Sequence, residues 1–111
     1  MQYAPDVMSA QCPSRLLMNQ ATSKWGVLVL LALQGRTLRY SALRGMIEGV
    51  SDRMLAQTLK SLETHGFLTR KAFQVVPPHV EYSLTDFGEG AANHVAALAG
   101  FLESAVEKVQ A

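Results

Sequence analysis

The chain has 111 residues, which is enough for one domain with a modest hydrophobic core. Hydrophobic residues make up 49% and charged residues 17%, so the composition excludes an intrinsically disordered chain. The longest apolar run, residues 27–33, is far shorter than the roughly 20 residues that cross a bilayer, and the start of the chain lacks the layout of a secretion signal. The single cysteine excludes an intrachain disulfide. We therefore expect a cytoplasmic protein with no membrane partner.

Charge is unevenly distributed along the chain, although its net value is only +1. Residues 36–80 contain seven basic and three acidic residues, a net +4, whereas residues 81–111 contain one basic and five acidic residues, a net −4. A local basic field attracts polyanions whatever the total charge. The two segments are therefore expected to have different functions.

The chain is predicted to begin with a flexible N-terminal arm over residues 1–11, which are polar and show no periodicity. Residues 12–111 are then expected to form one domain. Pro13 occupies a position where a first helical residue is common, and a short helix is expected over residues 15–21.

A second helix is predicted from Lys24 to Gln34, with Ser23 as its N-cap and Gly35 at its end. Its residues are apolar nearly all round, which predicts a helix that is buried on most sides. A buried strand remains an alternative, because short apolar runs occur in both structures.

A helix-turn-helix is predicted over residues 36–66. Residues 36–39 form a short extended connector, and the apolar spacing of residues 40–47 predicts an amphipathic helix that ends near Gly49. A tight turn then leads into a second helix over residues 51–66. In this arrangement the second helix reads the major groove of DNA.

The second helix of this motif has two distinct faces, one apolar and one polar. Ser51 is a suitable N-cap, and Gly66 supplies the residue that ends the helix. Long donor side chains in a row can make bidentate contacts with base edges, although a solvated surface face is the alternative reading. The apolar face consists of Leu55, Leu59 and Leu62, and the polar face carries Arg53, Gln57 and Lys60.

Two short strands are predicted over residues 67–74 and 80–84, with two consecutive prolines restraining the turn between them. A helix-turn-helix followed by a β-hairpin is a winged helix, so the predicted fold is mainly α with a small β-hairpin (α+β). Wings usually contact phosphates or the minor groove. The cationic or donor side chains expected there are Arg70, Lys71 and, near the tip, His79.

The last helix is predicted to follow Thr85 as its N-cap, and residues 85–111 are expected to be a dimerisation helix. Its apolar residues recur every three or four positions over three heptads, which is typical of a helix–helix seam. Leu16 of the first helix is expected to contribute. A helix folded back on its own core is the alternative. The seam comprises Phe87, Ala91, Val95, Leu98, Leu102, Ala105 and Val109.

Four pieces of sequence combine into a recognisable pattern: the Cys12-Pro13 and Lys24-Trp25 pairs, Ser51–Leu62, and Val76–Thr85 (VPPHVEYSLT) followed by Gly88. Together they resemble the HxlR family of bacterial winged-helix regulators, relatives of the MarR group, over residues 12–100. The wing sequence is the specific part of the resemblance. The resemblance implies a homodimeric transcription factor that binds a palindromic double-stranded DNA operator and needs no cofactor.

The DNA-binding residues expected from the helix and the wing lie in the basic segment of the chain. His79 stands where the family commonly has an arginine, and Ser23 stands where it usually has a glycine. The expected contacts are Ser51, Arg53, Met54, Gln57, Thr58, Lys60, Arg70, Lys71 and His79.

Cys12 is a candidate redox sensor, because several proteins of the family resemble thiol sensors that use a cysteine at this position. A reactive cysteine needs a stabilised thiolate, which a helix N-terminus or a nearby cation such as Arg15 can supply. A second chain or a small thiol would have to provide the other sulfur atom. The alternative is an unreactive cysteine beside the dimerisation helix.

Enzymatic and metal-binding motifs are missing from the sequence. His65, His79 and His94 lie on three different predicted elements without metal-ligand spacing, so no metal site and no catalytic residues are expected. The remaining alternative to a DNA-binding regulator is a winged helix that contacts another protein.

Overall fold

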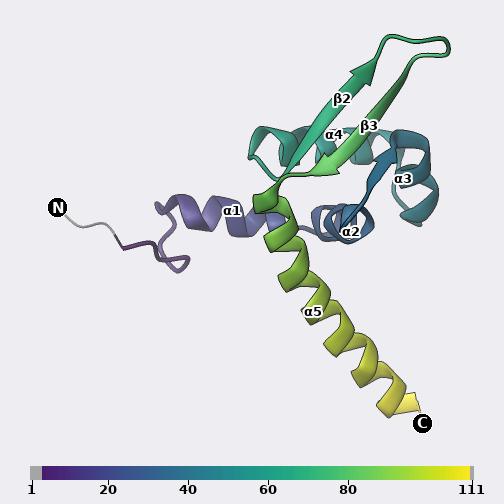
Figure 1. Ribbon diagram of the computed structural model, residues 1–111. Helices are drawn as coiled ribbons and strands as arrows, with labels where there is room; N and C mark the ends of the chain where they lie inside the picture. Colours follow the sequence, from purple (N-terminus) through teal and green to yellow (C-terminus); the bar gives the residue numbers. More distant parts are fainter. Residues whose placement is uncertain (1–3, 111) are drawn as a thin grey trace.

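The computed structural model describes residues 4–110, and for residues 109 and 110 it describes the backbone alone. Within this range the chain forms five helices and a three-stranded antiparallel sheet (Figure 1). The predicted α+β winged helix-turn-helix is confirmed. The elements are α1 (Pro13–Thr22), α2 (Lys24–Leu33), β1 (Thr37–Arg39), α3 (Tyr40–Met46), α4 (Asp52–Thr64), β2 (Leu68–Phe73), β3 (His79–Leu84) and α5 (Asp86–Gln110).

Helix α2 forms the centre of the hydrophobic core. Its N-cap is Ser23, whose hydroxyl oxygen accepts a hydrogen bond from the backbone N–H of Gly26 at 3.1 Å. Val29, Leu30 and Leu33 have no exposed surface. The apolar run is therefore a buried helix and not the alternative strand, since neighbouring helices cover it on several sides.

The helix-turn-helix consists of α3 and α4, which are joined by a turn containing Gly49 at φ +88°. The hydroxyl oxygen of Ser51 accepts a hydrogen bond from the backbone N–H of Met54 at 3.1 Å and so caps α4. Gly66 follows the helix at φ +83°, in the left-handed region that glycine adopts without strain. The apolar face predicted for α4 is confirmed, because Leu55, Leu59 and Leu62 are buried.

The sheet has one more strand than the predicted hairpin, because residues 37–39 of the expected connector form β1. The strand order is β1-β3-β2, with Leu38 opposite Tyr82. The hydroxyls of Thr37 and Ser83, 46 residues apart in sequence, are 2.7 Å apart. A three-residue segment has too little alternation to be identified as a strand, so only its distant partner β3 defines it.

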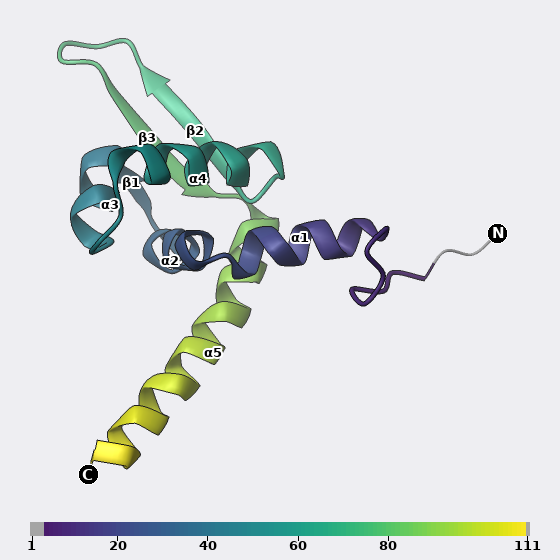
Figure 2. The same ribbon diagram turned by 180° about the vertical axis from the view of Figure 1, so that it is seen from behind.

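Helix α5 starts at the junction of α4 and β2 and then leaves the body of the molecule (Figures 1 and 2). Thr85 caps it, because its hydroxyl oxygen accepts from the backbone N–H of Gly88 at 3.0 Å. The Glu89 carboxylate accepts the backbone N–H of Gly35 at 3.0–3.1 Å and ties the first turns of α5 to the end of α2. The second half of α5 projects free of the domain.

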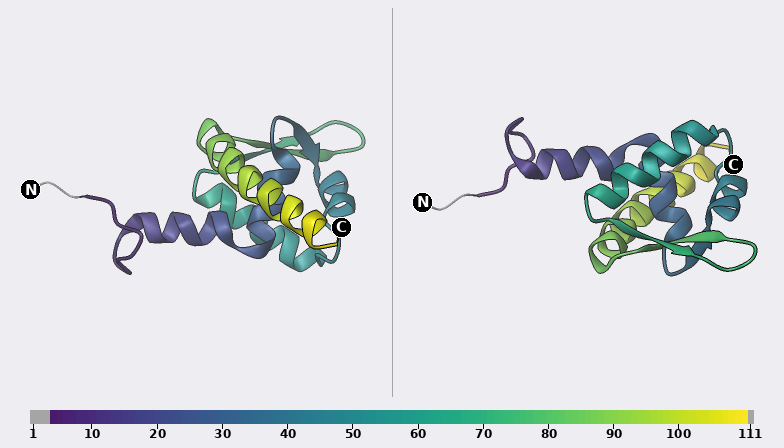
Figure 3. Two further views of the ribbon diagram at one scale, coloured as in Figure 1. Left: turned by 90° about the horizontal axis from the view of Figure 1, so that it is seen from below. Right: turned by 90° about the horizontal axis from the view of Figure 1, so that it is seen from above.

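Helix α1 extends away from the body on another side (Figure 3). The backbone before it turns back over residues 6–12, and the guanidinium of Arg15 donates to the carbonyls of Val7 at 2.7 Å and Met8 at 2.9 Å. The flexibility expected for the arm stays a prediction, and its first three residues lie outside the described part.

In the described part of the chain, no single helix has the length and apolar character needed to cross a membrane. Only α1 and α2 taken together reach that length and composition, and they meet at a bend of 73°.

Candidate nucleic-acid interface

The polar face of α4 is exposed along its length. Arg53, Gln57 and Lys60 are all exposed, and their spacing along the helix places them in one row. Within residues 4–110, neither Arg53 nor Lys60 forms an ion pair. Their donor groups are therefore available to an external acceptor, such as a base edge or a phosphate oxygen.

Three further residues predicted to contact DNA lie at the N-cap and in the first two turns of α4. The Ser51 hydroxyl is engaged in the helix cap, and the Thr58 hydroxyl donates to the carbonyl of Met54 at 2.7 Å. The Met54 side chain is 39% exposed. Because the Thr58 proton is already used, its outward groups are a methyl group and an accepting oxygen.

Helix α4 and the wing stem enclose a hollow of about 340 Å³, which we call the α4–wing hollow. It brings Lys60 of α4 and Arg70 of β2 to the same depression, although they are separate in sequence. Cations on α4 and on β2 can both contact the phosphate backbone of a DNA strand that passes between the helix and the wing. The lining residues are Ala56, Leu59, Lys60, Glu63, Arg70 and Tyr82.

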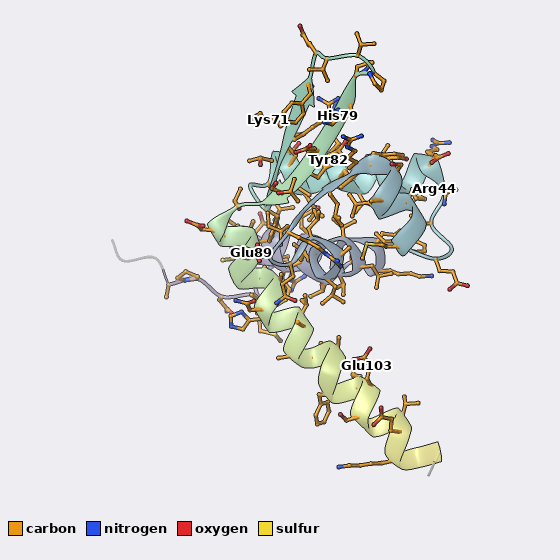
Figure 4. The ribbon with its side chains drawn as sticks, turned by 45° about the vertical axis from the view of Figure 1, so that its right-hand side comes forward. Arg44, Lys71, His79, Tyr82, Glu89 and Glu103 are labelled. Carbon is orange, nitrogen blue, oxygen red and sulfur yellow. The ribbon has the colours of Figure 1, made fainter. Side chains whose placement is uncertain are left out.

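His79 lies in the outermost residue pair of the wing, next to the tip loop, which agrees with its predicted position near the tip, but its intramolecular contacts were not predicted. It is the first residue of β3, and its ring stacks on Phe73 with centroids 4.7 Å apart and an interplanar angle of 18°. Its Nε2 atom is 3.1 Å from Oε2 of Glu81, and only 19% of its side chain is exposed. Figure 4 shows His79 and Lys71 in the stem, behind the loop. His79 therefore has intramolecular partners instead of pointing outward as a free donor.

A polar cluster that the sequence prediction missed joins the two helices of the helix-turn-helix. Nε of Arg44 donates to Oδ1 of Asp52 at 2.8 Å, and the Tyr40 hydroxyl donates to the same oxygen at 3.1 Å. These hydrogen bonds, the one from Arg44 foremost, hold the pKa of Asp52 below its usual value. Burial, followed by the hydrogen bond to Asp52, raises the pKa of Tyr40. The cluster fixes α3 against the start of α4.

The only sequence signal for this cluster was the position of Arg44 in the basic segment. Periodicity marks the buried face of a helix, but it does not identify which exposed side chains meet across a turn. Figure 4 shows Arg44 on α3, away from the wing.

The residues predicted to form the dimer interface fall into two groups. Leu16, Phe87, Leu98 and Leu102 are 47–56% exposed, and Ala105 is also exposed. In contrast, Ala91 and Val95 are partly buried against the chain's own core. The side chain of Val109 lies outside the described residues. The exposed residues of this group that belong to α5 form an apolar strip along that helix, next to an apolar hollow of about 230 Å³ between α1 and α5.

Cys12 lies at the N-cap position of α1, and 5% of it is exposed. Its Sγ atom accepts the backbone N–H of Asp6 at 3.3 Å and lies 2.9 Å from the Ser14 hydroxyl oxygen. The start of a helix stabilises a thiolate, whereas burial opposes it. Among the described residues, no group of three or more potential metal ligands occurs.

Comparison with known proteins matches residues 21–110 to the family described as HxlR-like helix-turn-helix. The HTH-type transcriptional regulator YtfH of Escherichia coli K12 is 53% identical over 106 residues, which cover 96% of this chain and 84% of YtfH. The solved structure of the transcriptional regulator ytfH from Salmonella typhimurium is 50% identical, with a TM-score of 0.87 and 96% of each chain covered.

A further solved structure, the redox regulator HypR in its oxidized form, is 30% identical with a TM-score of 0.76. The match covers 84% of this chain and 96% of that one. These relatives are described as regulators, and the fold, the exposed α4 face and the wing of this chain agree with that description. The chain belongs to the HxlR-like helix-turn-helix family and is a transcriptional regulator of the helix-turn-helix type.

Proposed function

We propose that the protein binds double-stranded DNA as a homodimer and recognises a palindromic operator through α4. The observation that carries this proposal is the unpaired row of Arg53, Gln57 and Lys60, which continues into the α4–wing hollow. The row would read base edges in the major groove, while Arg70 and Lys71 contact the adjacent phosphates of the DNA backbone.

The second copy of the chain is proposed to bind along the apolar strip of α5, with help from α1. Leu98 and Leu102 lie on a helix that leaves the body of its own domain, and more than half of the surface of each is exposed. A two-fold pair of chains would hold the two α4 helices about one duplex turn, ~34 Å, apart, which matches two half-sites of a palindrome.

Arg53→Ala tests the reading face directly. The variant should bind the operator more weakly by about 1–3 kcal/mol, as expected for a lost base contact. Lys108→Ala is the control, because it removes a cation from the far end of α5 without touching α4 or the wing. Equal affinity of Arg53→Ala and the wild type, measured by fluorescence anisotropy, would remove Arg53 from the base-reading residues.

The salt dependence of binding separates DNA recognition from the alternative of protein contact. If about 4–8 phosphates are neutralised per dimer, log Kd should change with log salt concentration with a slope of magnitude about 4–7. A shallow response without preference for palindromic duplex would favour the protein-contact alternative.

We further propose that Cys12 makes binding sensitive to oxidants. The likeness to the redox regulator HypR and the place of Cys12 at the start of α1 support this proposal. Diamide would accept two electrons and two protons while the Cys12 thiol forms a disulfide with a small thiol or with Cys12 of a second chain. Non-reducing gels and intact mass should show the adduct in the wild type and not in Cys12→Ser. A wild type that stays unmodified would refute sensing.

A further inference from the structure

The outermost part of the wing carries no charge, and apart from Gln74 its residues are apolar. Residues 72–78 contain no acidic or basic side chain. Val76 is 99% exposed and Val75 is 52% exposed, at a loop that projects well beyond the other elements (Figures 1 and 2). An apolar side chain that its own domain leaves in water gains free energy if a partner covers it.

In the stem behind this tip, polar and aromatic side chains of β2 and β3 contact one another. The Lys71 ammonium lies 5.0 Å from the centre of the Phe73 ring, and that ring stacks on His79. His79 in turn contacts Glu81. Lys71, His79 and Glu81 therefore have partners within the wing, and the exposed loop beyond them is Val75–Pro78.

The tip also continues the surface that faces DNA in the proposed function. Arg70, further back on β2, lines the α4–wing hollow together with Lys60. If the phosphate backbone of one DNA strand passes through that hollow, the wing loop extends across this strand toward the neighbouring minor groove. The walls of that groove are deoxyribose rings, which accept apolar contacts, and apolar wedges there bend the duplex.

We propose that the wing tip, Val75–Pro78, enters the minor groove of DNA as an apolar wedge instead of contacting phosphates with a cation. This proposal rests on the proposed DNA binding. The wedge would add affinity without releasing counterions, and it would favour flexible pyrimidine–purine steps beside the half-site, because those steps unstack most easily.

The substitution Val76→Thr tests the wedge, because threonine keeps the branched shape and replaces one methyl group by a hydroxyl. Operator affinity should fall about three- to tenfold while the salt slope stays unchanged, and the bend measured by circular-permutation gels should decrease. Val76→Lys should instead steepen the slope by about 2 per dimer, since each wing gains a phosphate contact. Val7→Thr, an exposed valine outside the wing, is the matched control and should change neither quantity.

The full-length Val76→Thr protein should keep its thermal stability, because the side chain has almost no intramolecular contact. If the operator affinity and the DNA bend angle of this variant equal those of the wild type, the wedge proposal is refuted. The exposed tip would then be assigned to contact with a protein partner. Arg53→Ala, measured in parallel, distinguishes the two failures. A loss with Arg53→Ala but not with Val76→Thr refutes only the wedge, whereas absence of duplex binding by the wild type refutes the proposed function and the wedge together.

Discussion

Gly88 is the residue on which the position of α5 depends most directly. A Cβ atom at this position would overlap the carbonyl oxygen of Phe67, so only glycine lets the first turn of α5 approach the start of the wing so closely. In the sequence, Gly88-Glu89-Gly90 is only a fragment of a glycine-rich loop, and a glycine at the start of a helix is the preferred interpretation. The structure places Gly88 in the first turn of α5 and gives it a packing function.

Gly88→Ala should lower the free energy of unfolding by about 3 kcal/mol, because the added methyl group must push backbone atoms apart. Gly90→Ala is a sharp control on the same helix, since nothing lies within 4 Å of its added Cβ. That variant should be more stable by roughly 0.5–1 kcal/mol, because alanine favours the helix. Urea unfolding measures both changes, and similar values for the two variants would contradict the close-contact explanation.

Asp52 makes part of the stability depend on pH. Its folded-state pKa is lowered by hydrogen bonds from Arg44 and Tyr40, so its contribution is complete above the unfolded value of about 3.8 and is lost as pH falls through the folded value. Asp52→Asn should therefore be less stable than the wild type near neutral pH. The difference should shrink below about pH 4. A stability difference that stays constant down to pH 2 would show that the charge of Asp52 is not responsible.

At the scale of elements, the helices follow from local patterns, whereas strand pairing does not. The buried leucines and the two caps of α4 are visible in a short window of sequence, because helical contacts recur every three or four residues. Strand β1 became visible only through its pairing with β3. The His79–Phe73 stack is likewise set by cross-strand register, which the prediction of His79 as a donor group near the tip did not include.

Lys71 belongs to the wing as an element, and its substitution tests the wing's proposed phosphate contact. Lys71→Ala should weaken binding to operator and unrelated duplexes by the same factor, and it should reduce the salt slope by about 1 for each wing. Competition assays with specific and non-specific DNA measure this. A loss confined to the operator would mean that the stem reads sequence.

At the scale of the whole molecule, α5, α1 and the wing project from the body in different directions, and the molecule extends over 52 × 50 × 24 Å. Figure 4 shows Glu103 on the projecting half of the helix, which carries exposed apolar and acidic side chains. The first turns are anchored to α2 through Glu89 and Gly35, so a second copy bound to the outer half would be held in a fixed orientation relative to α4.

Leu98→Glu should convert the proposed dimer to a monomer, because a carboxylate in an apolar interface loses its hydration without gaining a partner. Ser104→Glu adds the same charge to α5 outside the apolar row and should leave the dimer intact. Sedimentation equilibrium distinguishes these results. A Leu98→Glu protein that still sediments as a dimer would place the interface elsewhere.

The sequence by itself determined the helices, their caps, the wing and the exposed row on α4, because each depends on contacts between residues near one another in the chain. The tertiary structure decided which exposed groups meet. It added β1 to the sheet, joined Arg44 and Tyr40 to Asp52, placed Lys60 beside Arg70, and left Val76 uncovered at the wing tip. These arrangements depend on strand register and on the packing of elements distant in sequence, which local periodicity does not encode.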